Sequence, residues 1–164
     1  MAARARREPA LATAAVETAD NGPDRLDTSF LESLVGYNAR RAALHAIAID
    51  MEVFAAHQLR VVDFSVLSVL LHNPGTTSRQ LCQALGVLPP NMVTLLAALD
   101  RRGLLDRRPH PTDGRAVALH LSAAGARLTR QLEKAVAALE SRVAGRLSAE
   151  ERRTLHALLQ RVYL

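Results

Sequence analysis

Arginines surround a short run of turn-forming residues in the second half of the chain. Arg107 and Arg108 come immediately before this run and Arg115 directly after it, in the sequence RRPHPTDGRAVAL. A guanidinium group binds a phosphate or a base edge through two parallel hydrogen bonds, which suits nucleic-acid recognition. Lys134 is the only lysine among the 21 basic residues, although a preference for arginine can also reflect the base composition of a genome. The pattern predicts phosphate contacts at a loop tip, and the alternative is a solvated turn whose charges do nothing.

The other reactive side chains show no pattern typical of a catalytic or metal centre. The sequence contains no nucleophile and base pair, glycine-rich phosphate loop or paired-carboxylate arrangement. No two histidines have H-x-x-x-H spacing, and the single cysteine, Cys82, cannot form a thiolate cage. We expect Cys82 to be a small buried hydrophobe, with a redox-sensing thiol as the alternative. The sequence therefore predicts a protein that is not an enzyme and that has no metal site and no cofactor.

The composition favours a mainly helical protein with an aliphatic core. Of the 164 residues, 49% are apolar but only 3% are aromatic, so leucine, alanine and valine must build the core. A chain of this length forms one domain of ordinary size without disulfides or metals. Because a single cysteine excludes an internal disulfide, the reducing cytoplasm is the expected compartment. No apolar stretch approaches the ~20 residues that span a bilayer, so we expect no membrane partner.

Capping residues and apolar periodicity predict two helices in the first half of the chain. Ser29 and Glu32 have the spacing of a capping box, and the apolar residues behind them indicate one long helix to about residue 57. Asp63 fits the N-cap of a second helix over residues 64–72. This second helix is apolar almost all round, so we expect it at the centre of the fold.

The middle of the chain predicts a helix-turn-helix followed by a hairpin. Thr77 and Gln80 have capping-box spacing and indicate a third helix that ends at a glycine. A fourth helix is expected over residues 89–102, with one buried face formed by Met92, Leu95, Leu96 and Leu99. Residues 104–108 and 115–121 are expected to be the two strands of a hairpin. Together these elements predict a winged helix-turn-helix, whose second helix enters a DNA major groove.

Two longer helices are expected after the hairpin. Ser122 opens a helix whose apolar residues alternate steps of four and three, namely Leu128, Leu132, Ala135 and Leu139. Ser148 and Glu151 have capping-box spacing before a last helix that carries Leu155, Leu158, Leu159 and Val162. The first and last helices offer more apolar surface than a small winged lobe can cover. We therefore predict a homodimer formed through these helices, and the alternative is packing within the chain.

These patterns also predict how the chain is divided. Residues 1–26 have no apolar periodicity, and we expect them to form a disordered N-terminal tail. Residues 27–164 are expected to form a single domain. Within it, residues 63–121 form the DNA-binding lobe, and residues 27–60 and 122–164 form a helical dimerisation region.

The central segment resembles the MarR-type winged-helix regulators. The stretch QLCQALGVLPPNMVTLLAALDRRGLLDRRPHPTDGRAVALHLSAAG is similar to their helix-turn-helix, wing and following helix, including the D-x-R of the wing at Asp113 to Arg115. The specific match covers residues 77–125, and a looser one extends over about 30–162. This resemblance implies a homodimer that binds a pseudopalindromic operator in double-stranded DNA, usually as a repressor that a small ligand releases.

The expected recognition helix departs from that pattern in its exposed face. Thr94 stands where such families often carry an arginine, so the face is small and nearly uncharged. We predict that Asn91 reads an adenine edge and that Thr94 or Ala97 touches a thymine methyl group, while arginines elsewhere supply affinity. Asp113 is expected to brace an arginine, and the alternative is that the face consists of small surface residues without a role. The complete predicted DNA-binding set is Ser78, Arg79, Pro90, Asn91, Thr94, Ala97, Arg101, Arg107, Arg108, Asp113 and Arg115.

Polar residues on the first helix predict a second site. Asn38 and His45 fall on its apolar stripe with Arg41 at the margin, and a buried amide or imidazole costs about 1 to 3 kcal/mol if it is left unpaired. One candidate partner is a small aromatic carboxylate, held between the first helices and the DNA-binding lobe. Arg41 would pair with its carboxylate and His45 would donate to it; in the resembled family, effectors such as phenolic acids often bind there. The alternative is hydrogen bonding across the dimer interface.

The sequence is also compatible with functions other than that of a ligand-released repressor. A winged helix can bind another protein as an adaptor, although the core of a protein interface is normally depleted of charge. A regulator can also act without a ligand or respond to oxidation. A steep loss of duplex binding with salt distinguishes the DNA-binding function from the adaptor.

Overall fold

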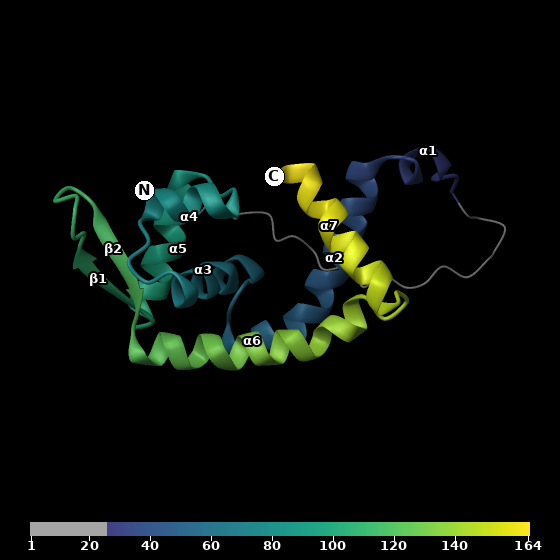
Figure 1. Ribbon diagram of the computed structural model, residues 1–164. Helices are drawn as coiled ribbons and strands as arrows, with labels where there is room; N and C mark the ends of the chain where they lie inside the picture. Colours follow the sequence, from purple (N-terminus) through teal and green to yellow (C-terminus); the bar gives the residue numbers. More distant parts are fainter. Residues whose placement is uncertain (1–25) are drawn as a thin grey trace, which may run out of the picture. The chain divides into compact units, whose positions relative to one another are not determined.

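The computed structural model describes residues 26–164 of the chain. Helices dominate this part, together with one two-stranded antiparallel sheet, which confirms the predicted fold class (Figure 1). Residues 1–25, which belong to the predicted disordered tail, lie outside the described residues. The chain divides into two units after Ala48, and each unit is described by itself.

The first unit contains a short helix and the greater part of a long one. Helix α1 spans Ser29–Glu32 and helix α2 spans Val35–Phe54, so the predicted continuous helix is interrupted. At the break, the Asn38 side-chain amide donates to the carbonyl oxygens of Glu32 and Leu34, at 2.7 and 2.8 Å. The interruption is stabilised because side-chain hydrogen bonds of this kind compete with those of a regular helix.

The predicted capping box between Ser29 and Glu32 is wrong. Thr28 precedes α1, and its hydroxyl donates to Glu32 Oε1 at 2.5 Å. The amide of Ser29 instead donates to Asp27 Oδ1 at 2.9 Å, and hydrogen bonding from Ser29 lowers the pKa of Asp27. An aspartate two residues before an amide can close such a turn by itself, so Ser29 is not needed as the cap.

The second unit begins with the end of α2 and a turn into the central helix. A 3-10 turn, η1, spans Ala55–His57, and helix α3 spans Val61–His72. Asp63 is not the N-cap that the sequence predicts but the third residue of α3. Its carboxylate accepts from the Arg60 amide at 2.8 Å and from the Arg60 guanidinium at 3.0 Å. This carboxylate closes the first turn from inside the helix, so α3 begins before Asp63.

Helix α3 lies in an aliphatic core, as its apolar sequence predicts. It contributes Val66, Leu67 and Leu70, each at most 1% exposed. The other buried members of the core are Phe54, Leu59, Leu81, Met92, Leu96, Leu99, Leu104, Leu105, Leu119 and Leu132. Full burial of a leucine-sized side chain stabilises the fold by roughly 1.5 to 3 kcal/mol. The core therefore extends from the end of α2 to the helix after the wing, beyond residues 63–121.

The helix-turn-helix forms as predicted. Helix α4 spans Ser78–Leu85 and helix α5 spans Pro89–Arg101, with a left-handed turn at Gly86 (φ 63°) between them. The capping box is confirmed, because the Thr77 amide donates to Gln80 Oε1 at 2.8 Å and the Gln80 amide donates to Thr77 Oγ1 at 3.3 Å. The predicted buried face of α5 is also confirmed. It consists of Met92, Leu95, Leu96 and Leu99, each at most 4% exposed.

A two-stranded wing follows α5. Strand β1 spans Leu105–Pro109 and strand β2 spans Val117–Leu121, and their residues pair in antiparallel order from end to end. The loop after α3 is attached to this wing. The Gly75 amide, in a left-handed backbone conformation (φ 91°), donates to the Leu119 carbonyl oxygen at 2.8 Å, and Thr76 forms a bridge with Leu119. The wing therefore joins the lobe through backbone hydrogen bonds as well as through its buried leucines.

The helix after the wing packs on the lobe. Helix α6 spans Ala123–Val143 and lies against α3 (Figure 1). Ser122 caps it as predicted, by accepting a hydrogen bond from a first-turn amide at 3.0 Å. Leu132 is buried in the core, and Glu133 Oε1 accepts from Ser68 Oγ at 2.7 Å. The first half of α6 thus packs against α3 of the same chain.

The last helix has no buried side chain of its own. Helix α7 spans Ala149–Tyr163 and starts with the predicted capping box, in which the Ser148 amide donates to Glu151 Oε2 at 2.7 Å. Hydrogen bonding from Ser148 lowers the pKa of Glu151. The apolar residues of α7 are between 37% and 73% exposed, and they are Leu155, Leu158, Leu159, Val162 and Tyr163.

No single helix within residues 26–164 is both long and apolar enough to cross a membrane. Two bent pairs of helices reach that length and composition together: Val35–His57 with Val61–His72 at 78°, and Ser78–Leu85 with Pro89–Arg101 at 114°. In the same part of the chain, no three His, Cys, Asp or Glu side chains are grouped so as to hold a metal ion.

A glycine allows α6 to approach the segment between α5 and β1. A Cβ atom on Gly125 would collide with the Leu104 carbonyl oxygen and lie 3.0 Å from its carbon. We expect Gly125→Ala to lower the free energy of unfolding by about 1 to 3 kcal/mol, because overpacking outweighs the better helix propensity of alanine. Urea unfolding measures this change. Gly36 in α2 has no atom within 4 Å of a built Cβ, so Gly36→Ala should be neutral or stabilising. A Gly125→Ala protein as stable as wild type would contradict the close contact.

Candidate nucleic-acid interface

The two faces of α5 differ in the way a recognition helix requires. Its apolar face is buried, whereas Pro90, Asn91, Thr94 and Arg101 are exposed and Ala97 is half-buried. This exposed face carries one charged residue of the five, as the sequence predicts. The Thr94 hydroxyl donates to the Pro90 carbonyl oxygen at 3.2 Å, so its hydrogen is already used within the helix. Its methyl group remains for an apolar contact, and its hydroxyl oxygen can still accept a hydrogen bond.

A groove runs beside this face, between α4, α5 and the wing. Its volume is about 370 Å³, and residues of all three elements line it, among them Ser78, Arg79, Val93, Arg107 and Val117. Three residues that the sequence predicts to bind DNA, Ser78, Arg79 and Arg107, thus come together around one cavity. Apolar side chains line the groove together with Arg79 and Arg107, and a guanidinium group can pair with a phosphate oxygen.

Val93 is a member of this surface that the sequence reasoning missed. Its side chain is 63% exposed although it lies in the middle of the recognition helix, next to the buried Met92. The signal was present in the spacing, since Val93 falls outside the buried stripe of α5. An exposed valine at this place presents methyl groups to the groove.

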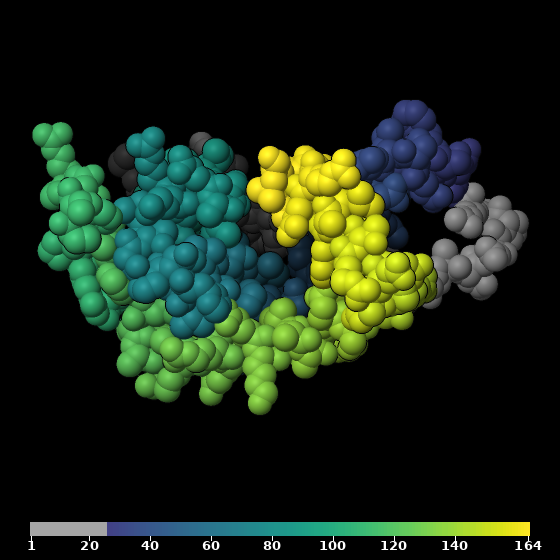
Figure 2. All heavy atoms as spheres, viewed as in Figure 1, coloured from purple at the N-terminus to yellow at the C-terminus, as the bar shows by residue number. Residues whose placement is uncertain are grey.

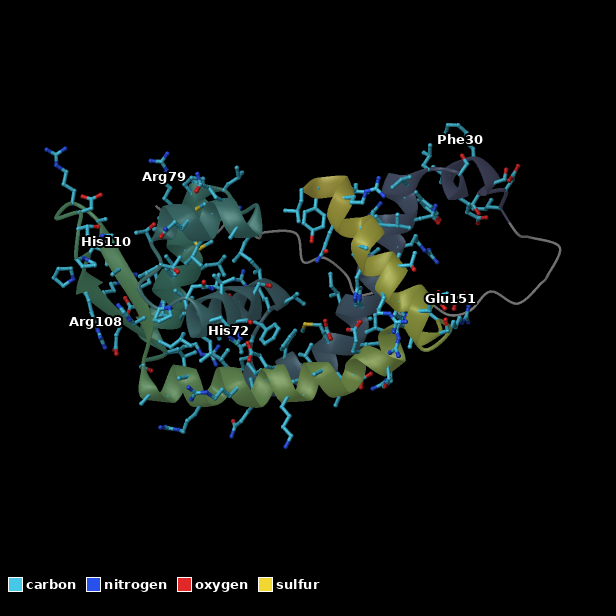
Figure 3. The ribbon with its side chains drawn as sticks, viewed as in Figure 1. Phe30, His72, Arg79, Arg108, His110 and Glu151 are labelled. Atoms are coloured by element: carbon cyan, nitrogen blue, oxygen red, sulfur yellow. The ribbon has the colours of Figure 1, made fainter. Side chains whose placement is uncertain are left out.

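The wing arginines do not all face the same way. Arg107 Nε lies 2.9 Å from Asp100 Oδ2 of α5, whereas Arg108 lies 3.9 Å from Asp106 on its own strand. Neighbouring residues of a strand point to opposite faces, so Arg107 and Arg108 lie on opposite sides of the wing. Figure 3 shows Arg79 projecting at the upper end of the lobe and Arg108 at the lower edge of the wing. The groove therefore includes Arg107 and not Arg108.

At the wing tip, the predicted role of Asp113 needs correction. Asp113 Oδ1 accepts from the backbone amide of Arg115 at 3.0 Å, and the Asp113 carbonyl oxygen accepts from the Ala116 amide at 3.0 Å. Asp113 therefore shapes the turn and does not brace a guanidinium, because an aspartate in a turn reaches the amide two residues later. The wing tip protrudes beyond the helices of the lobe, as Figure 2 shows. Arg115 is exposed at this tip.

The three predicted effector residues lie on α2 in the first unit. Asn38, Arg41 and His45 are all exposed in this chain, so the burial on which their assignment was based is not provided within the first unit. Both hydrogen bonds of the Asn38 amide nitrogen go to backbone carbonyls at the α1–α2 break. Its carbonyl oxygen is thus the atom that Asn38 could offer to a ligand.

An ion pair connects the end of α2 with α6 in the second unit. The Arg142 guanidinium donates to both carboxylate oxygens of Glu52, at 2.6 and 2.8 Å. This hydrogen bonding holds the pKa of Glu52 below its usual value and raises that of Arg142. Burial, assisted by the negative charge of Glu140, raises the pKa of the neighbouring Asp50. The pair of Glu52 and Arg142 therefore ties the end of α2 to α6 within the unit.

Comparison with known proteins agrees with this geometry. Residues 57–116 match the model of the MarR family. The chain is 34% identical over 100 residues to a putative transcriptional regulatory protein for the hcr operon of Thauera aromatica; the match covers 61% of this chain and 60% of that relative. The structure of the transcriptional repressor CouR bound to a 23-mer DNA duplex is similar with a TM-score of 0.79 and 33% identity. The match covers 86% of this chain and 100% of that one. The chain belongs to the MarR family.

Another MarR-family relative is the transcriptional repressor Rv2887 of Mycobacterium tuberculosis. It is 31% identical over 104 residues, which cover 63% of this chain and 75% of the relative. Its structure in complex with salicylic acid has a TM-score of 0.64 and 27% identity, and the match covers 79% of this chain and 96% of that one. MarR-family membership makes this chain a DNA-binding transcriptional regulator rather than an enzyme, as the sequence predicts.

The pairing of Arg107 with Asp100 yields a prediction for this MarR-family protein. Both side chains are about two-fifths exposed, so Asp100→Asn should change the free energy of unfolding by less than about 1 kcal/mol. The same change should tighten binding to duplexes of any sequence by roughly two- to fivefold at low salt, because it releases a guanidinium and removes a negative charge.

Fluorescence anisotropy with a labelled, scrambled duplex measures this effect. Glu150→Gln is the control, since it removes the same charge from an exposed position on α7 and leaves the ion pairs of Arg107 and Arg108 intact. It should tighten binding less. Weaker binding by the Asp100→Asn protein would show that the pair matters for the position of the wing more than for charge.

Proposed function

We propose that this protein is a homodimeric transcriptional repressor that binds a pseudopalindromic operator and is released from it by a small aromatic carboxylate. The observation that carries the proposal is the recognition surface of α5. It is exposed and nearly uncharged beside a groove that Arg79 and Arg107 border. Because its target is DNA, we expect the protein to act in the cytoplasm.

The exposed apolar face of α7 supports the homodimer. Leu155, Leu158, Leu159 and Val162 stand at i, i+3, i+4 and i+7, which places them on one side of the helix, and none is buried within the chain. Such a stripe normally packs against another element. A second copy of α7 is the partner that an isologous two-fold dimer provides. Two copies would then place their recognition helices about 34 Å apart, one turn of DNA.

The roles within the DNA interface divide between specificity and affinity. We assign Asn91 to an adenine edge, and Thr94, Ala97 and Val93 to apolar contacts with thymine methyl groups. The other predicted residues supply phosphate contacts or surround the reading face: Ser78, Arg79, Pro90, Arg101, Arg107, Arg108 and Arg115. Asp113 maintains the turn that presents Arg115.

Two substitutions test this division on an operator selected from random or genomic DNA. Asn91→Ala should relax specificity at one base pair by roughly 1 to 3 kcal/mol and leave the other positions unchanged. Arg115→Ala should weaken all sequences alike and reduce the slope of log affinity against log salt by about one. Binding isotherms at several salt concentrations, on cognate and single-base variants, separate the two patterns. Equal loss on cognate and scrambled DNA for Asn91→Ala would refute base reading.

The proposed ligand is an aromatic carboxylate because Rv2887 forms a complex with salicylic acid. On α2, Arg41 offers a guanidinium for a carboxylate, and His45 and the Asn38 carbonyl oxygen offer further hydrogen bonds. Such a ligand releases the operator if it binds the DNA-free form more tightly than the bound form.

Titration of salicylate against the protein–operator complex tests this part of the proposal. We expect release by salicylate and not by salicylamide, which has the same shape but no charge. Arg41→Ala should raise the salicylate concentration for half-release by about tenfold or more, since it removes a charge-assisted hydrogen bond. Arg40→Ala, one residue away on α2, is the control and should respond like wild type. Unchanged sensitivity of the Arg41→Ala protein would exclude this residue from the ligand site.

A further inference from the structure

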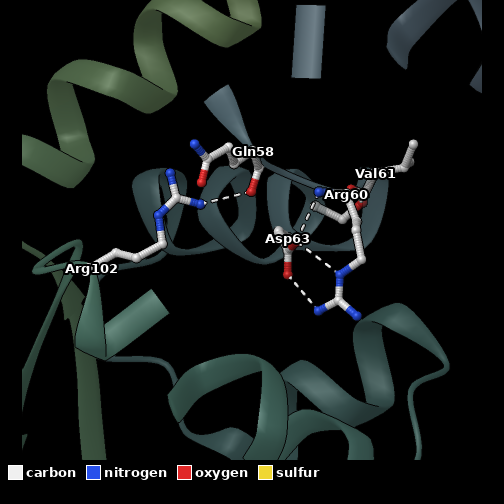
Figure 4. Close-up of polar contacts among 6 residues, drawn as sticks. Gln58, Arg60, Val61, Asp63 and Arg102 are labelled. Atoms are coloured by element: carbon white, nitrogen blue, oxygen red, sulfur yellow. Dashed lines mark hydrogen bonds and ion pairs between the residues drawn. The ribbon is translucent and has the colours of Figure 1, made fainter. Parts of the chain in front are cut away.

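The C-terminal end of the recognition helix is tied to the turn that joins α2 and α3. The Arg102 guanidinium donates from Nη2 to the His57 carbonyl oxygen at 2.8 Å and from Nη1 to the Gln58 carbonyl oxygen at 3.1 Å. Figure 4 shows this side chain crossing from the end of α5 to the backbone of Gln58. Two donors on one planar group fix direction as well as distance.

The two carbonyls are available because a helix ends there. The last carbonyl groups of a helix have no partner within it and carry partial negative charge, which attracts a cation. The Gln58 amide donates to the Ala55 carbonyl oxygen and the Leu59 amide to that of Phe54, so the two preceding acceptors at this end are occupied. Arg102 supplies donors for two later ones, those of His57 and Gln58.

The turn itself has a defined conformation. Gln58 has φ 51°, the only positive φ at a non-glycine among the described residues, and it reverses the chain. Leu59, directly after it, is only 2% exposed and anchors the turn in the core. On the far side, Asp63 binds the amide and guanidinium of Arg60 and so fixes the start of α3 (Figure 4). The turn to which Arg102 binds is therefore a well-anchored part of the fold.

The same end of α5 is also connected to the wing. Asp100, two residues before Arg102, pairs with Arg107 of β1 at 2.9 Å. Burial of the apolar face fixes the rotation of α5 about its own axis. Polar contacts add restraint at the C-terminal end of the helix, from the wing on one side and from the α2–α3 turn on the other.

We infer that Arg102 is a positioning residue that fixes the orientation of the recognition helix against the α2–α3 turn, and so sets the half-site spacing that the protein accepts. This inference rests on the proposed function, since spacing has a meaning only for a dimer on two half-sites. One base pair shifts a half-site by about 3.4 Å along the DNA axis and turns it by about a tenth of a revolution. A recognition helix held in one orientation cannot follow such a shift without loss of contacts. A helix free to pivot follows it more readily.

The test compares operators whose half-sites are one base pair closer, at the cognate spacing, or one base pair farther apart. Full-length wild-type protein should prefer the cognate spacing. Arg102→Gln should reduce the ratio of affinities between the cognate and the altered spacings by on the order of tenfold, which is within the usual range of coupling between sites. Arg130→Gln is the matched control, because it removes the same charge from an exposed position on α6. It should keep the wild-type preference.

Arg102→Lys distinguishes the effect of the positive charge from that of the paired hydrogen bonds. It is also the second variant to measure if Arg102→Gln folds poorly. An ammonium group keeps the charge but lacks the planar pair of donors, so the spacing preference should fall between those of wild type and Arg102→Gln. Thermal unfolding of each variant accompanies the binding data. A residue with a purely structural role would lower the unfolding temperature and leave the ratio of affinities between spacings unchanged.

The outcomes separate this inference from the proposed function. If wild type discriminates between spacings and folded Arg102→Gln discriminates equally well, the positioning role is wrong. If Arg102→Lys matches wild type, the two-carbonyl contact is not what sets the spacing, and the inference fails in that form. If wild type itself binds all spacings alike, the proposed dimeric function fails first and the inference falls with it.

Discussion

Burial of one face of α5 determines what the opposite face presents to DNA. Met92, Leu95, Leu96 and Leu99 are all withdrawn from water, and their burial fixes the rotation of the helix about its own axis. That rotation leaves Asn91 outside without any specific contact of its own. The groove depends on the same constraint, because Val93 borders it only while Met92 next to it is inside. Burial of the apolar face thus determines which residues of α5 are exposed to DNA.

Charge is distributed around this surface rather than on it. The exposed side of α5 is nearly neutral, whereas guanidinium groups stand on α4, on the wing and at the C-terminal end of α5. A neutral helix can approach base edges closely, and cations at the periphery attract phosphate without dictating sequence. Three of these arginines also have a partner in the fold: Arg107 pairs with Asp100, Arg108 pairs with Asp106, and Arg102 binds carbonyls of the α2–α3 turn. Their positive charge contributes to the field while their geometry stabilises the lobe.

Local signals were predictable from the sequence, and tertiary ones were less so. The capping boxes at Thr77 and Ser148 are confirmed, and each depends on residues three positions apart. The equally spaced pair Ser29 and Glu32 fails because Asp27 accepts from the Ser29 amide. The break before α2 was missed because the apolar spacing continues through it, while the Asn38 amide competes for the carbonyls there. The partner of Arg107 could not be assigned either. Asp113 is nearer in the loop, but only the folded hairpin brings Asp100 to the guanidinium.

The proposed two-fold symmetry gives these internal contacts a consequence beyond one chain. In an isologous dimer, every displacement of one DNA-binding lobe is repeated in the other, so the separation of the two recognition helices changes by twice the movement of each. A small pivot that is harmless to folding therefore matters for operator choice. The hydrogen bonds of Arg102 act at the C-terminal end of α5, where a tilt of the helix about its middle produces a large movement. Weak, exposed contacts can thus control DNA recognition in a lobe whose stability depends on its aliphatic core.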